Sequence, residues 1–279
     1  MDGIFLVDKP SGLTSHDVVF KIKKQFKLNK VGHTGTLDPF ATGLLMILVG
    51  KATKLAFLFD ALDKRYTGQI ILGKAYDTDD VTGKVIDELP VDYTKDMLAH
   101  AISTFKPNYM QMPPNYSAIK QDGIKAYDAA RMGKALTLRP RYVEIYTFDY
   151  QAHTETIDFD THVSKGTYIR SIARDIGQQL NTYGALQTLR RIAIGPYKID
   201  DAKPLSDITS NDFIDHRLLF QNIQTLKLND YLIKLVKNGV KLDERQITTD
   251  KPFVVVDKHD EMIAYYEPVH HEYRVKYFF

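Results

Sequence analysis

The stretch from Val31 to Gly43 reads V-G-H-T-G-T-L-D-P-F-A-T-G. Its three glycines and its proline argue against a regular helix or a central strand, because glycine permits backbone angles that other residues resist and proline withholds an amide donor. Pro39 also biases Asp38 away from the helical region of backbone conformation. The strongly apolar segment Leu44 to Val49 follows at once. The sequence therefore predicts a shaped loop that is anchored on a core strand and presents one carboxylate in a fixed position.

This loop resembles the signature of the TruB-type tRNA pseudouridine synthases. Further segments resemble that family and occur in its order: G-I-F-L-V-D-K-P-S-G at Gly3 to Gly12, K-R-Y at Lys64 to Tyr66, Y-S-A-I-K at Tyr116 to Lys120, S-K-G-T-Y-I-R at Ser164 to Arg170, and L-R-R at Leu189 to Arg191. Each segment alone is a weak signal, whereas the ordered set is specific.

The predicted elements independently favour the α+β class, because strands and helices occur without regular βαβ alternation. The resemblance implies the pseudouridine synthase fold, with a mixed or antiparallel central sheet, flanking helices and loops, and a small PUA-like, β-rich appendage. We expect a catalytic domain over residues 1–219, with a basic RNA-clamping insertion at about 106–141, and a C-terminal RNA-binding or packing domain over 220–279. A surface excursion without a role is the alternative for the insertion, and a simple packing cap is the alternative for the tail.

Hydrophobic periodicity and turn residues place the individual elements. Strands are expected over 3–7, 44–49, 65–72, 142–150, 155–163 and 189–194, with a hairpin of strands 252–258 and 261–267. Helices are expected after an N-cap at Ser15, over 51–62, after a cap at Thr94, over 124–132, after Thr167, and over 219–240 with a stop at Gly239.

Composition is typical of a soluble globular protein of 279 residues, with 44% hydrophobic and 26% charged residues. The chain has no cysteine, which excludes disulfides and thiolate metal sites. It has no apolar run near the ~20 residues that span a bilayer, and its acidic start does not match a signal peptide. We therefore expect a cytoplasmic protein without a membrane partner. The net charge of +2 is uninformative, although basic residues gather in 117–141 and 161–199; phosphate binding and plain solvation both explain them.

Two metal-like patterns fail. Asp77 to Gly83 hints at a calcium loop, but a valine replaces a ligand and the glycine comes one position late. His270-His271-Glu272 lacks the H-E-x-x-H spacing. We expect no metal.

The resemblance implies isomerisation of uridine to pseudouridine at position 55 in the T-loop of tRNA. That reaction breaks the N1–C1′ bond and joins C5 to C1′, without redox change or an imported group, so no cofactor is expected. The implied partner is the T-stem-loop of tRNA. We expect a monomer without an obligate protein partner.

The resemblance also implies three catalytic residues. Asp38 corresponds to the catalytic aspartate, which can attack C1′, attack C6, or stabilise an eliminated glycal. Arg170 corresponds to the arginine that pairs with this carboxylate and offsets the effect of burial on its pKa. Tyr66 corresponds to the tyrosine that covers the flipped-out base and helps move the C5 proton. Turn formation is the structural alternative for Asp38, and pairing elsewhere or a phosphate contact is the alternative for Arg170.

Further substrate-binding residues follow from the same comparison. His33 resembles the histidine that supports the flipped-out RNA loop, Tyr168 a second ring in the pocket wall, and Leu189 an apolar contact to the base. Lys64 and Lys165 are equally compatible with phosphate contact and with plain solvation.

Two other functions share these features. An RNA-binding or RNA-folding protein could keep the fold and lack the chemistry. An RNA N-glycosidase would use the same aspartate and release free uracil.

Overall fold

The computed structural model describes residues 1–279 except 118–119, 122–123, 126–131, 133–137, 244 and 271. A large mixed sheet forms its centre. Its strands are β1 (Gly3–Lys9), β2 (Val31–Thr34), β3 (Thr42–Val49), β4 (Lys64–Leu72), β7 (Asn108–Gln111), β10 (Arg141–Ala152), β11 (Thr156–Val163), β12 (Gly184–Ile194), β13 (Tyr197–Lys198), β14 (Lys203–Pro204) and β15 (Ile214–Asp215).

The sheet order is β14-β1-β3-β12-β4-β11-β10-β7; outside this path β2 pairs with β3, β13 with β12 and β15 with β1. The first four residues of the expected loop, Val31–Thr34, are therefore a strand, because they pair with β3. Most neighbours are antiparallel, whereas β12 runs parallel to β3 and β14 runs parallel to β1. The predicted α+β class with a mixed sheet is confirmed.

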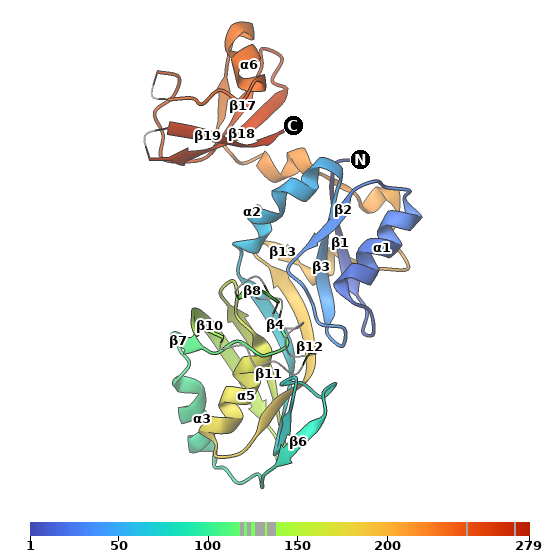
Figure 1. Cartoon of the computed structure of the whole chain (residues 1–279), viewed down its shortest axis with the longest axis vertical. Helices are drawn as coiled ribbons and strands as arrows, with labels where there is room; N and C mark the ends of the chain where they lie inside the picture. The colour runs from blue at the N-terminus through green and yellow to red at the C-terminus, as the bar shows by residue number, and fades with distance from the viewer. Residues whose placement is uncertain (118–119, 122–123, 126–131, 133–137, 244, 271) are drawn as a thin grey trace.

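Alternating side chains let the sheet carry a core on each face, because successive residues of a strand point to opposite sides. Phe5 and Val7 of β1 join one core, while Ile4 and Leu6 join the other. On the first face lie α1 (Ser15–Gln25), α3 (Lys95–Ser103) and α5 (Ile169–Gln179). Figure 1 shows α1 beside β1 and β3, and α3 and α5 beside β10 and β11. The other face is covered by η1 (Gly50–Leu55), α2 (Ala56–Asp60) and part of the C-terminal module.

A second, smaller sheet follows near the C-terminus. It contains β16 (Thr225–Lys227), β17 (Phe253–Val256), β18 (Met262–Val269) and β19 (Glu272–Phe278), and α6 (Asp230–Lys237) packs on it. Phe253 and Val255 face the module's own core, whereas Val254 and Val256 face the core behind the central sheet. The predicted β-rich appendage is therefore present, and it packs on the back of the central sheet.

The start of α1 differs from the prediction. Thr14, not Ser15, is the N-cap: its hydroxyl accepts a hydrogen bond from the Asp17 amide at 3.0 Å, and the Asp17 carboxylate accepts from the Thr14 amide at 2.8 Å. Ser15 is the first helical residue and is buried. Its hydroxyl accepts from the amide of Leu37 at 2.9 Å and lies 3.1 Å from the Leu37 carbonyl oxygen. The helix start is thereby bonded to the residue before Asp38.

Other predicted elements need correction. The expected helix 51–62 is divided into the 3₁₀ segment η1 and the short α2. The expected helix 124–132 lies mostly outside the described residues, and Ile124–Lys125 instead forms β9, paired with β8 (Lys120–Gln121). The expected helix 219–240 is wrong in its first half, where η4 (His216–Phe220) and β16 precede α6. The Asn229 side chain accepts from the Leu232 amide at 3.0 Å and starts α6 there. Strand β12 begins earlier than expected, and β19 was not predicted.

The remaining short elements lie in connections. They are the hairpin of β5 (Lys74–Tyr76) and β6 (Val85–Glu88), and the 3₁₀ segments η2 (Ile199–Asp201) and η3 (Ser210–Asp212).

Candidate active site

The loop after β2 is held from several sides. Gly35 and Gly43 have φ of +67° and +103°, which disfavour other residues. A Cβ on Gly43 would lie 2.3 Å from the Arg191 carbonyl oxygen, so only glycine fits against β12. The Pro39 carbonyl accepts from the Gly12 amide at 2.8 Å and from Lys9 Nζ at 3.3 Å. Lys9 is fully buried and also donates to the carbonyls of Pro10 and Leu13, which gives it a structural role.

Asp38 and Arg170 form a two-point ion pair although they are far apart in sequence. Arg170 Nε lies 2.9 Å from Asp38 Oδ2, and Nη2 donates to Oδ1 at 3.2 Å. Arg170 extends from the first turn of α5 and is buried, while a third of the Asp38 side chain is exposed. Such a bidentate pair fixes the orientation of both carboxylate oxygens.

Asp80 is a second carboxylate at Arg170, and the sequence did not single it out. Its Oδ2 lies 3.5 Å from Arg170 Nη1, and its side chain is 4% exposed. The other oxygen, Oδ1, accepts hydrogen bonds from the Thr78 hydroxyl and the Thr82 amide at 3.0 Å. The only signal in the sequence was the acidic segment of Asp77 to Gly83, which we interpreted as a turn. Arg170 therefore lies between two carboxylates, and one of them faces the pocket.

Burial raises the pKa of Asp38, and Arg170 opposes this shift without cancelling it. The negative charge of Asp80 adds to the upward shift. We had expected the arginine to restore the pKa, but desolvation is the larger effect here.

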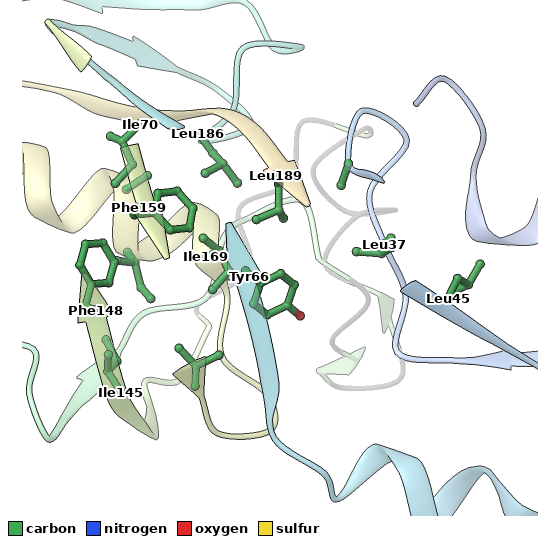
Figure 2. Packing of buried hydrophobic residues seen from close by; sticks show 14 of the residues in the cluster. Leu37, Leu45, Tyr66, Ile70, Ile145, Phe148, Phe159, Ile169, Leu186 and Leu189 are labelled. Atoms are coloured by element: carbon green, nitrogen blue, oxygen red, sulfur yellow. The ribbon is translucent and has the colours of Figure 1, made fainter. Parts of the chain in front are cut away.

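A cavity of about 480 Å³ opens at this ion pair. Its wall is made by Thr36, Leu37, Asp38, Tyr66, Tyr116, Ser117, Thr167, Tyr168, Ile169, Arg170 and Leu189. Figure 2 shows Tyr66 on β4, with Leu189 and Ile169 on one side and Leu37 on the other, and with its hydroxyl directed toward the Leu37 side. The structure thus brings together Asp38, Arg170, Tyr66, Tyr168 and Leu189 from the predicted set.

Tyr168 is fixed by neighbours that the sequence did not reveal. Gln111 of β7 is fully buried and accepts from the Tyr168 amide at 2.8 Å while donating to its carbonyl at 3.0 Å. The Arg141 guanidinium lies 5.5 Å from the centre of the Tyr168 ring. No pattern near Gln111 pointed to this contact.

The other predicted residues lie outside the cavity wall. His33 is half-buried on β2, and the Nδ1 atom has no hydrogen-bond partner among the described residues. Burial and the positive charge of Arg191 lower the pKa of His33, which favours the neutral form of the ring. Lys165 is exposed in the turn before Thr167.

Lys64 is neither solvated nor directed at the cavity. It is buried, and its Nζ donates to the carbonyls of Leu62 at 2.5 Å, Asp60 at 3.2 Å and Phe59 at 3.4 Å. These carbonyls are at the end of α2, where a cation is favoured. Of the two interpretations that we weighed for Lys64, solvation is wrong, and the ammonium has no donor direction left for phosphate.

The described residues contain no group of three or more His, Asp or Glu side chains that could hold a metal ion. In the same part of the chain, no helix is long and apolar enough to cross a membrane.

Residues 23–169 match the family model described as TruB family pseudouridylate synthase, N-terminal domain. The chain belongs to the TruB family. It is 61% identical to tRNA pseudouridine synthase B of Acholeplasma laidlawii over 279 residues, covering 100% of both chains. It is 35% identical to the protein of that name from Lactobacillus acidophilus over 283 residues, covering 96% of this chain and 94% of the relative. The predicted resemblance is confirmed.

Solved structures support the fold. A Cbf5-Nop10-Gar1 complex contains a chain that matches with a TM-score of 0.71 and 24% identity, over 96% of this chain and 78% of that one. At this identity the likeness shows the fold alone. It agrees with a TruB-type central sheet followed by a PUA-like module.

Proposed function

We propose that this TruB-family chain converts uridine to pseudouridine at position 55 in the T-loop of tRNA. One observation carries the proposal. The Asp38 carboxylate lines a cavity with aromatic walls, and both of its oxygens are bonded to Arg170. The name of the full-length relatives, tRNA pseudouridine synthase B, supports the substrate.

The target nucleotide is flipped out of the RNA in this proposal. Asp38 lies in a cavity that also contains Tyr66, Tyr168 and Leu189, and a stacked base cannot reach it. Flipping costs a few kcal/mol, and contact of the uracil with the two rings recovers part of it.

Asp38 acts as the nucleophile. A carboxylate oxygen of Asp38 bonds to the nucleotide and the N1–C1′ bond breaks, after which the uracil turns while it is retained in the cavity. When C5 bonds to C1′, the bond to Asp38 breaks again and the carboxylate is regenerated. The proton on C5 leaves by way of the Tyr66 oxygen and N1 gains a proton, so atoms and electrons balance without a cofactor. Arg170 keeps Asp38 ionised and correctly oriented during this sequence.

The remaining surfaces bind the RNA around the target. We assign His33 to support of the opened T-loop. We assign Lys165 to phosphate contact, because Lys165 is exposed and lies two residues before Thr167 of the cavity wall. Residues 1–219 are the catalytic domain, the insertion at about 106–141 clamps the RNA, and residues 220–279 add an RNA-binding surface. The protein acts as a monomer on cytoplasmic tRNA.

Incubation with an unmodified tRNA transcript tests this proposal. Pseudouridine is mapped by carbodiimide labelling and primer extension, with a transcript that has cytidine at position 55 as the control. We expect one modification at position 55, which the control transcript lacks. Pseudouridine elsewhere would contradict the site. Free uracil would indicate an N-glycosidase, and binding without any product would indicate an RNA-binding protein.

A further inference from the structure

Arg191 is a fully buried arginine on β12. Its side chain is 1% exposed, and among the residues that the structure describes no carboxylate lies within ion-pair distance. Its positive charge also acts unfavourably on Lys9, His33 and Lys64. Because an unpaired buried cation is costly, fold stability alone does not explain an arginine at this position.

The backbone of Arg191 joins the two halves of the candidate active site. In the sheet its Cα pairs with Gly43 of β3 on one side and with Tyr66 of β4 on the other. The loop that carries Asp38 therefore ends against Arg191, and the strand that carries Tyr66 lies directly beside it.

The side chain of Arg191 lies against the same two parts of the site, the Asp38 loop and Tyr66. Nε donates to the Leu44 carbonyl and Nη2 to the Gly35 carbonyl, each at 2.7 Å. These carbonyls lie on either side of the Asp38 loop. Tyr66, which lies opposite Arg191 in the sheet, also acts on the guanidinium, because its hydroxyl raises the pKa of Arg191 against the lowering effect of burial.

We propose that Arg191 is a positioning residue whose guanidinium fixes the Asp38 loop and the Tyr66 hydroxyl relative to each other. The proposal rests on the proposed function, because it assumes that Asp38 and Tyr66 act on one nucleotide. Arg191 does not reach the cavity wall, so its effect passes through these two groups.

Substitution by lysine separates this role from charge alone. Arg191→Lys keeps a positive charge, but one ammonium cannot occupy the two separate positions from which Nε and Nη2 of the planar guanidinium donate to Leu44 and Gly35. We expect kcat to fall by about 10- to 100-fold while KM for tRNA changes less than about threefold, since the two reacting groups are misplaced and the RNA-binding surface is intact. Arg190→Lys is the matched control, because Arg190 is the neighbouring residue and pairs with Asp8 at 2.7 Å; its kcat should stay near wild type.

A double-mutant cycle with Tyr66→Phe tests the coupling. Without the hydroxyl, Arg191 has one group less to place, so the combined loss should be smaller than the product of the single losses. A purely structural Arg191 would lower thermal stability and give multiplicative losses. Wild-type kcat in Arg191→Lys, a change confined to KM, or multiplicative losses would each overturn the proposal.

Arg191→Gln serves if Arg191→Lys does not fold. Its neutral side chain leaves no unpaired buried charge, and one amide nitrogen replaces the two nitrogens that donate to the Gly35 and Leu44 carbonyls. The same kcat loss, reduced in the Tyr66→Phe background, supports the proposal, and its absence overturns it. Turnover by the wild type distinguishes the two levels: without wild-type product the proposed function fails, whereas product with unaffected variants rejects only the role of Arg191.

Discussion

Arg170 shares its guanidinium between Asp38 and Asp80, and this arrangement governs the chemistry available at the residue scale. Two carboxylates around one cation leave Asp38 less stabilised than a simple pair would. Burial adds to this effect, so the pKa of Asp38 lies above its ordinary value. The proposed nucleophile is therefore a more basic carboxylate than an exposed aspartate.

The pH dependence of kcat/KM should reflect this shift. Asp38 must be ionised to act, so the rate is full above its pKa and falls as the pH drops through it, at a higher pH than the ~3.9 of a free aspartate implies. In Arg170→Lys the two-point pairing is lost, so the acidic limb should move to still higher pH and kcat should fall about 10²-fold. An unchanged acidic limb in the variant would contradict the pairing.

Asp80→Asn should move the same limb in the opposite direction. Removing that negative charge lowers the pKa of Asp38, because Asp80 contributes to the upward shift. The pH profile of kcat/KM measures the shift, and Asp77→Asn in the same acidic segment is the control. Movement of the limb to higher pH in Asp80→Asn would contradict the role of Asp80.

At the scale of elements, α1 supports the loop through its first turn. Thr14 and Asp17 cap the helix, and Ser15 bonds to Leu37 beside Asp38. Thr14→Ala should lower the free energy of unfolding by about 1 kcal/mol, since an amide at the helix start loses its acceptor. Urea denaturation measures the loss. Thr14→Ser, which keeps the hydroxyl, should restore most of the stability; equal stability of the alanine variant would contradict the capping role.

The sequence predicted correctly those elements that are determined by residues close together in the chain. The glycine loop, the apolar β3, the cap at Thr94 and the amphipathic α5 depend on residues within one or two turns. The segment 219–240 was misassigned because β16 exists through pairing with β17, where Thr225 pairs with Val254. Helical spacing of Leu219 and Ile223 cannot reveal that distant partner.

In the candidate site, too, residues in local motifs could be predicted, whereas residues that act through contacts remote in sequence could not. Asp38, Tyr66 and Arg170 could be chosen because they lie in quoted motifs. Asp80 and Gln111 could not, because their significance lies in contacts with Arg170 and Tyr168, which are remote in sequence. Lys64 lies in a motif, but no sequence pattern predicts that its ammonium donates to carbonyls at the end of α2.

For the whole molecule, the C-terminal module shares a core with the central sheet. Val254, Val256, Tyr265 and Tyr277 pack in one cluster with Ile4, Leu44 and Met46. The two sheets should therefore unfold in one calorimetric transition, with equal calorimetric and van't Hoff enthalpies. Val254→Asp, which places a charge in the shared core, should lower the transition temperature. Two separate transitions in the wild type would contradict the shared core.

The catalytic role of Asp38 is the central claim, and single-turnover kinetics of Asp38→Asn test it most directly. The amide keeps the size of the side chain but removes the nucleophilic charge. With a tRNA transcript at saturating enzyme, we predict that pseudouridine formation at position 55 falls about 10⁴-fold or more, while tRNA affinity in a filter-binding assay stays within about threefold of wild type. Pseudouridine formation at the wild-type rate by Asp38→Asn would contradict the account.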